Sequence, residues 1–359
     1  MFTQKALEDI RAIDIQNASN SENPMNDFKV EIGPTDTISA LEFGPSVLQK
    51  NLLLAGGWDN TVRCWDVKQN GSTVAKGMKN LKAPVLDVCW TDVGDKVFIA
   101  STNTQIKMWD LASDKVTTVG THEAPIKTCH WIKSPNYSCL MTGSWDKTLK
   151  FWDPRAPNPM LSLLLPERCY CADVDYPMAV VGSANKMISI YSLEGTPTLY
   201  AQEESPLNSQ TRSISVIKYE NIPSGYVVGC IAGRMALQYV NEKARHLNYK
   251  CMCHRRINQS SVIDVFAVND IIVHPVHGTI ATVGSDGTFC FWDLDQHTRL
   301  KLSKTMAMSI TKCAFNPKGD IFAYAVGYDW AQGYEFYDPV KKPNLFLHAC
   351  FDETKPKTS

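Results

Sequence analysis

The sequence repeats a short strand-like segment that ends in a tryptophan–aspartate pair or in a similar aromatic residue. Four copies are clear: CWD at 64–66, MWD at 108–110 and FWD at 151–153 and 291–293. Weaker copies end near Tyr191, Tyr239 and Tyr337. The seven aromatic positions lie about 39 to 53 residues apart, close to the ~40–45 residues of a four-stranded propeller blade. The repeat therefore predicts seven such blades.

Each unit follows the same order of strands and turns. The third unit is the clearest, with strand-like segments at 126–131, 139–144 and 148–152 and a turn at Asp146 and Lys147. A single blade cannot bury both of its faces, so blades stack around an axis, and a closed ring removes exposed sheet edges. We therefore expect an all-β fold, a seven-bladed β-propeller of WD repeats, with blade one starting at Ile38 and blade seven at Ile310.

Closure of the ring requires a strand from outside the last repeat. The alternating segment 28–32 precedes the first full repeat and is the expected outer strand of blade seven, with 344–351 as the competing segment. The predicted organisation is a polar N-terminal arm at 1–25, the propeller at 26–351 and a C-terminal tail at 352–359.

Composition narrows the class of protein. The net charge is -1, so any contact with nucleic acid must come from a local basic cluster. Twelve cysteines without a secretory leader pattern indicate reduced thiols in the cytosol or nucleus. We expect no membrane insertion, because no apolar run approaches ~20 residues. The sequence contains no Gly-rich phosphate loop, HExxH motif or paired carboxylates, so we expect a non-enzymatic protein without a cofactor.

Two clusters contain residue types that are common in catalytic or metal sites, and the first has a structural explanation. His122, Ser144 and Asp146 resemble a Ser-His-Asp nucleophilic set. Many WD repeats instead combine a His, a Ser or Thr, an Asp and the strand Trp, here Trp152, in a buried hydrogen-bond network, and we expect that structural role here.

The second cluster is Cys251, Cys253 and His254. Its C-x-C-H spacing has no second pair of ligands at the distance typical of zinc sites. We therefore expect no metal site.

Three tryptophans stand out because they fall at or beside turns. Trp58, Trp145 and Trp330 lie near the turn between the second and third strands of their blades, where small polar residues are usual. Tryptophan is enriched among interface hot spots, so three of them on one rim predict a partner-binding face. The alternative is packing against a neighbouring loop.

A basic and aromatic group follows the fifth repeat and continues after the sixth. Such a group suits single-stranded nucleic acid, because bases stack on aromatic rings while phosphates pair with Lys and Arg. A solvated loop is the alternative. The group comprises Lys243, Arg245, His246, Tyr249, Lys250, His254, Arg255 and Arg256, followed by His297, Arg299, Lys301 and Lys304.

Long stretches of the chain resemble the messenger-RNA export factor family of nuclear pores, a WD-repeat family that binds the GLEBS hairpin of a nucleoporin. A sister family, the mitotic-checkpoint propellers, shares part of the pattern and remains the alternative: an adaptor that binds GLEBS segments of checkpoint kinases without RNA. The stretches that favour the export factor are APVLDVCW at 83–90, the run at 127–153, LPERCYCADV at 165–174, HPVHGTIATVGSDG at 274–287 and YDW with EFYDP at 328–339.

The resemblance implies an adaptor that holds a nucleoporin on one face and single-stranded RNA on a basic edge, in the nucleus, at the nuclear envelope and in the cytoplasm. It also implies links to mitotic or ubiquitin-ligase complexes. Leu294 and His297 replace basic residues of the family pattern, so we expect weaker RNA binding. The RNA-facing positions that carry over are Arg234, Tyr249, Trp292 and Arg299, beside which we place Lys250, His297 and Lys301.

Overall fold

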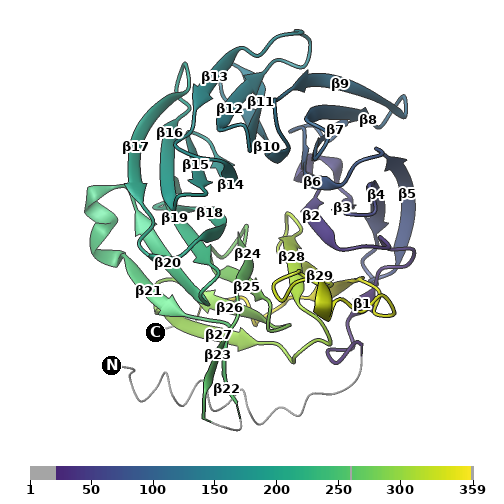
Figure 1. Cartoon of the computed structure of the whole chain (residues 1–359), viewed down its shortest axis with the longest axis vertical. Helices are drawn as coiled ribbons and strands as arrows, with labels where there is room; N and C mark the ends of the chain where they lie inside the picture. The colour runs from purple at the N-terminus through teal and green to yellow at the C-terminus, as the bar shows by residue number, and fades with distance from the viewer. Residues whose placement is uncertain (1–21, 259–260, 357–359) are drawn as a thin grey trace.

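The computed structural model describes residues 22–258 and 261–356. Seven four-stranded antiparallel sheets stand around a central axis as the blades of a propeller (Figure 1). The fold predicted from the sequence is thus confirmed. The predicted arm at 1–25 lies mostly outside the described residues.

Blades one to six each use four consecutive strands, with the first strand innermost. Blade one contains β2 (Ile38–Phe43), β3 (Asn51–Gly57), β4 (Thr61–Val67) and β5 (Thr73–Asn80). Blade two contains β6 (Val85–Trp90), β7 (Lys96–Ser101), β8 (Gln105–Asp110) and β9 (Lys115–Thr121). Blade three contains β10 (Ile126–Lys133), β11 (Ser138–Ser144), β12 (Thr148–Trp152) and β13 (Leu161–Leu164). Blade four contains β14 (Cys169–Asp175), β15 (Met178–Ser183), β16 (Met187–Ser192) and β17 (Thr198–Glu204). Blade five contains β18 (Thr211–Tyr219), β19 (Ile222–Cys230), β20 (Arg234–Tyr239) and β21 (Tyr249–Met252). Blade six contains β24 (Val268–Val273), β25 (Ile280–Gly284), β26 (Phe289–Asp293) and β27 (Thr298–Leu302).

Burial follows the position of a strand within its blade. The second strands β15, with the sequence MAVVGS, and β25 are buried along their whole length, and the other second strands are buried after their first one to three residues, because neighbouring blades cover both faces. The outer strand β5 alternates between half-buried and exposed residues, as expected for a strand with one face in solvent. The core is therefore a ring of apolar layers between blades.

The repeated aromatic residue occupies one register position on the third strand. Trp65 lies opposite Leu53, and Trp109 lies opposite Val97. Trp152, Tyr191 and Trp292 stand at the same position in blades three, four and six. In blade five Gln238 occupies it, and the predicted Tyr239 lies one residue further along the strand.

Blade seven is built from both ends of the propeller. Its order is β28 (Ile310–Phe315), β29 (Ile321–Val326), β30 (Asn344–Ala349) and β1 (Phe28–Lys29). Phe28 pairs with Leu347, so the N-terminal strand closes the ring as predicted. The competing segment 344–351 supplies the third strand instead.

The choice of Tyr337 as the aromatic residue of the seventh repeat is wrong. Tyr337 directly follows a short 3-10 helix, η3 (Tyr334–Phe336), and is 40% exposed. The corresponding register position, opposite Phe322, is filled by His348. The physical reason is that 328–343 contains glycine, aspartate and proline residues that favour turns, whereas NLFLHA at 344–349 alternates as a strand does.

His348 compensates for the missing tryptophan with ion pairs. Its Nδ1 lies 2.7 Å from Asp27, which precedes the closing strand, and its Nε2 contacts Glu353. Burial lowers the pKa of His348, but the hydrogen bonds to these two carboxylates outweigh it and raise that pKa to about 9. The C-terminal segment also packs on the ring, where Thr279 donates to the carbonyl of the buried Thr354 at 2.8 Å.

Aspartates on three inner strands link neighbouring blades around the central channel. Asp87 accepts the backbone N–H of Cys129 at 3.0 Å. Asp173 and Asp270 accept the N–H groups of Val216 and Cys313 in the same way, at 2.7 and 3.2 Å. These bonds fix the blades around the axis.

Blade five carries the main insertion. A 3-10 helix, η2 (Glu242–Leu247), joins β20 to β21, and a hairpin of β22 (Arg255–Ile257) and β23 (Ile263–Val265) projects from the ring before blade six (Figure 1). In the described part of the chain, every helix is too short or too polar to cross a bilayer.

Candidate interaction surfaces

A buried polar network pins blade three. His122 Nδ1 lies 2.8 Å from Asp146, and His122 Nε2 lies 2.8 Å from the hydroxyl of Thr142. Trp152 donates its indole N–H to the same hydroxyl at 2.8 Å. Ser144 lies outside this chain of bonds and donates to the carbonyl oxygens of residues 124 and 125.

The network places these groups in fixed protonation states. Burial lowers the pKa of His122, which keeps the ring neutral at neutral pH. Burial raises the pKa of Asp146, but hydrogen bonds from Thr148, the N–H of Glu123 and His122 outweigh it, so the net shift is downward. The hydroxyl of Thr142 is held between two rings and faces no open site. The geometry is that of a structural clamp.

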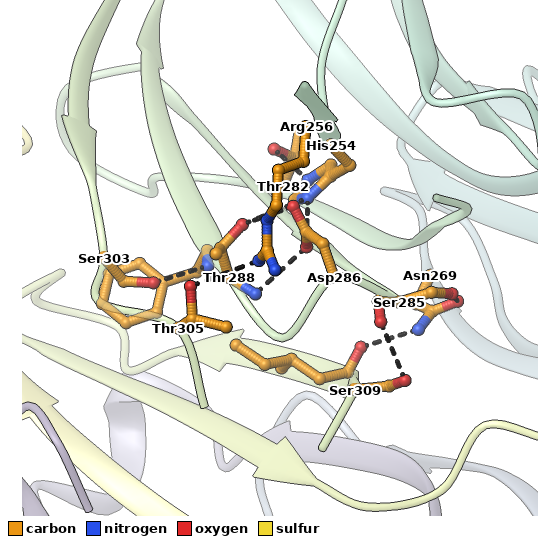
Figure 2. A network of polar contacts seen from close by, with 12 residues as sticks. His254, Arg256, Asn269, Thr282, Ser285, Asp286, Thr288, Ser303, Thr305 and Ser309 are labelled. Atoms are coloured by element: carbon orange, nitrogen blue, oxygen red, sulfur yellow. Dashed lines mark hydrogen bonds and ion pairs between the residues drawn. The ribbon is translucent and has the colours of Figure 1, made fainter. Parts of the chain in front are cut away.

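Blade six repeats this clamp. His254 lies 2.9 Å from Asp286 and 3.0 Å from the hydroxyl of Thr282, as Figure 2 shows. Trp292 donates to the same hydroxyl at 3.0 Å and is only 8% exposed. A sequence signal for this clamp is a Thr ten residues before the Trp: Thr282 precedes Trp292 by the same spacing as Thr142 precedes Trp152 in blade three.

The three turn tryptophans line one central cavity of about 660 Å³. Trp58 and Trp330 are 43% and 47% exposed, so large aromatic faces are open to solvent. The buried indole N–H of Trp145 has no hydrogen-bond partner among the described residues. Trp330 has a left-handed backbone (φ 61°) and stacks on Tyr337 at 5.1 Å.

Basic side chains line the floor of the same cavity. Lys127, Arg212 and Lys312 all reach it. Lys312 pairs with Asp270 at 3.1 Å, whereas no ion pair within the described residues includes Lys127 or Arg212. Burial lowers the pKa of both Lys127 and Arg212. Asp36 and Asp329 also line the cavity, which thus combines aromatic walls with three basic side chains and two carboxylates.

Four of the residues expected to contact RNA gather where blades five and six meet. The rings of Tyr249 and His297 lie 3.9 Å apart. Trp292 and Arg299 are cross-strand partners on β26 and β27. Trp292 is buried and its N–H donates to Thr282, so Tyr249, His297 and Arg299 are the members of this group that could contact RNA.

The other three expected residues lie apart from this junction. The exposed Lys250 follows Tyr249 on β21. Arg234 is the first residue of β20. Leu237, which pairs with Tyr249, lies three residues further along that strand, so Arg234 and Tyr249 are separated by roughly 10 Å in the strand direction. Lys301 forms an ion pair with Glu353 of the C-terminal segment.

Among the described residues, one group has metal-ligating side chains close together: His348, Cys350 and Glu353, whose ligand atoms lie within 4.8 Å of one another. Both ring nitrogens of His348 already contact carboxylates, and Lys301 contacts Glu353. Burial raises the pKa of the Cys350 thiol, which opposes formation of a thiolate ligand. The arrangement is that of a charge-balanced ion-pair cluster.

Comparison with known proteins agrees with the propeller geometry. The family model "WD domain, G-beta repeat" matches residues 28–66 and 113–153. Protein Rae1 of Drosophila melanogaster is 60% identical over 341 residues, which cover 95% of this chain and 99% of the relative. The mRNA export factor of Xenopus tropicalis is 51% identical over 344 residues, covering 95% and 94% of the two chains.

A solved structure titled "Crystal Structure of Mitotic Checkpoint Complex" contains a chain with the same fold, at a TM-score of 0.70 and 14% identity, covering 92% of this chain and 93% of that chain. At that identity the likeness concerns the fold alone. The identity and coverage together show that this chain belongs to the Rae1, or mRNA export factor, family of WD-repeat propellers.

Proposed function

We propose that this chain is an mRNA export factor, a non-enzymatic adaptor that binds the GLEBS hairpin of a nucleoporin and single-stranded RNA to support transport through the nuclear pore. It would act in the nucleus, at the nuclear envelope and in the cytoplasm. The observation that carries the proposal is the convergence of Trp58, Trp145 and Trp330 on one basic cavity. The names of its relatives support the transport role.

The cavity suits a protein hairpin for physical reasons. Two half-exposed indoles provide apolar contact area, and the unpartnered N–H of Trp145 can donate to a partner oxygen. Lys127 and Arg212 favour an acidic residue in the centre of the bound segment. A segment with apolar and acidic side chains would therefore complete the interactions that this face leaves open.

The test of the protein-binding face is isothermal titration with a synthetic nucleoporin GLEBS hairpin. Removal of one hot-spot tryptophan typically costs ~2 kcal/mol or more, so each of W58A, W145A and W330A is expected to weaken binding at least tenfold. The triple variant is expected to lose binding. Tyr200→Ala, which removes an exposed aromatic ring from the outer strand of blade four, is the matched control and keeps wild-type affinity.

Two results would contradict this proposal. One is a triple variant that still binds the hairpin with wild-type affinity. The other is a checkpoint-kinase GLEBS peptide that binds more tightly than the nucleoporin hairpin, which would favour the checkpoint adaptor.

The proposed RNA contact lies at the junction of blades five and six. Tyr249 and His297 offer adjacent rings for a base, and the cations of Lys250 and Arg299 lie on the two neighbouring outer strands. Arg234 would contact phosphate further along β20. We leave Lys301 outside the contact because Glu353 neutralises it.

RNA binding is tested with a fluorescent 12-nucleotide RNA at several salt concentrations. Neutralising Arg234, Lys250 and Arg299 together is expected to weaken binding and to lower the slope of log affinity against log salt by about 2, at ~0.7 per phosphate contact in single strands. The double variant K79Q/K186Q, on β5 of blade one and in the turn before β16 of blade four, is the control. Unchanged affinity and an unchanged salt slope in the triple variant would favour an adaptor that binds protein alone.

A further inference from the structure

A second cavity, of about 620 Å³, lies at the boundary of blades four and five. Its lining comes from the start of the second strands, such as Met178, and from the end of the third strands, such as Ser192. The tryptophan-lined cavity lies instead near the turns that join second strands to third strands. The two cavities therefore open on opposite faces of the ring.

The floor of this second cavity is apolar. Tyr200 and Ile222 also line it and are 67% and 60% exposed. Met178 and Ile190 form the buried base. Exposed apolar groups around a concave site are typical of a surface that a ligand covers.

Charged side chains of opposite sign stand on opposite walls. Glu194 follows β16 on the wall of blade four, whereas Lys243 and Arg245 project from η2 on the wall of blade five. Glu242 also belongs to η2, so that wall carries two cations and one anion. All four side chains are exposed, and none of them takes part in an ion pair within residues 22–258 and 261–356.

We propose that this cavity binds an extended peptide segment of a protein partner. An aromatic or branched aliphatic side chain of the segment enters between Tyr200 and Ile222, and an acidic residue of the segment faces Lys243 and Arg245. A peptide is favoured over single-stranded RNA because Glu194 and Glu242 repel phosphates. Ile190 and Ile222 are also aliphatic and offer no aromatic ring on which a base could stack. The site is independent of the function proposed above and lies on the other face of the ring.

The positions of the charges also favour one placement of the charged residues of the peptide. A cation in the segment would lie toward Glu194 on blade four, and an anion would lie toward η2 on blade five. Because the rim is exposed, its charges are expected to change affinity by a few-fold, whereas the apolar anchor carries at least a tenfold effect.

The experiment is a selection of random 12-residue peptides displayed on phage against the full chain. Recovered peptides are synthesised and their affinities are measured by fluorescence anisotropy. We expect an aromatic or branched residue with Asp or Glu a few positions away. The variant Y200S/I222S is expected to lose at least tenfold in affinity, while the matched control Leu164→Ser, an exposed apolar residue on the outer strand of blade three, binds as the wild type does.

A charge exchange separates a direct contact from a loss of structure. K243E/R245E is expected to weaken the acidic peptides several-fold and to bind more tightly the same peptides in which the acid is replaced by Lys. Peptides that bind Y200S/I222S and the wild type equally, or a charge exchange that restores no affinity, would overturn the proposal. Competition of the peptides by a 12-nucleotide oligouridine that K243E/R245E abolishes would also overturn it, by assigning the surface to nucleic acid.

Discussion

The clamp of blade six depends on a single hydroxyl group. Thr282 Oγ1 accepts the indole N–H of Trp292 at 3.0 Å and lies 3.0 Å from His254 Nε2. The other ring nitrogen of His254 lies 2.9 Å from Asp286, so every polar atom of the network has a partner. Thr282→Val keeps the side-chain shape but removes the hydroxyl.

The expected cost of Thr282→Val follows from burial. Thr282 is fully buried, and the change leaves the N–H of Trp292 and Nε2 of His254 without partners. Each buried polar group left unpaired costs about 1–3 kcal/mol, so the free energy of unfolding should fall by about 2–6 kcal/mol. Urea unfolding followed by far-UV circular dichroism measures the difference.

Blade six also provides the control. The hydroxyl of Thr298 is buried and has no hydrogen-bond partner among the described residues. Thr298→Val therefore removes an unsatisfied group and should leave stability unchanged or raise it slightly. Equal stabilities of the two valine variants would refute the role assigned to the clamp.

Three further stability predictions follow from the fold. The pKa of His348 rises from 6.5 in the unfolded chain to about 9 in the folded chain. Its contribution to the free energy of unfolding, about 3 kcal/mol, is therefore fully present below pH 6.5 and lost as pH rises through 9. In urea unfolding, His348→Gln should remove that part of the pH dependence, and identical pH profiles of variant and wild type would contradict this. Asp270→Ala leaves the cation of Lys312 buried without its partner and should cost about 3–5 kcal/mol, whereas a loss below 1 kcal/mol would show that water compensates. Gly120→Ala places a methyl group against the ring of Trp152 and should cost about 1–3 kcal/mol in thermal unfolding, and a variant as stable as the wild type would disprove that contact.

The periodic aromatic residues were sufficient to predict the blades, because each one fills the same place between neighbouring sheets. The prediction from aromatic residues is wrong where another kind of side chain fills that place. In blade seven a histidine held by Asp27 and Glu353 replaces the aromatic residue, and no local pattern links position 348 to a carboxylate 321 residues earlier in the chain. Tyr337 matched the motif but lies in a segment with turn-forming residues.

The candidate surfaces were predicted to different extents. Turn positions alone brought Trp58, Trp145 and Trp330 to one rim, since equivalent turns of a propeller share a face. The basic cluster was less predictable, because charge in sequence does not show whether a side chain is already paired, as Lys301 is with Glu353. The burial of Trp292 follows from a long-range clamp with His254, which the C-x-C-H pattern concealed.

We propose that separate regions of one ring bind a protein hairpin and an RNA strand. Hydrogen–deuterium exchange tests it directly, by comparing the free chain with the chain bound to a nucleoporin GLEBS hairpin and, separately, to a 12-nucleotide RNA. The claim predicts that the hairpin protects the turns around Trp58, Trp145 and Trp330, while RNA protects β21 and the β26–β27 hairpin. Protection of the same segment by both ligands, or no protection at the tryptophan turns, would contradict it.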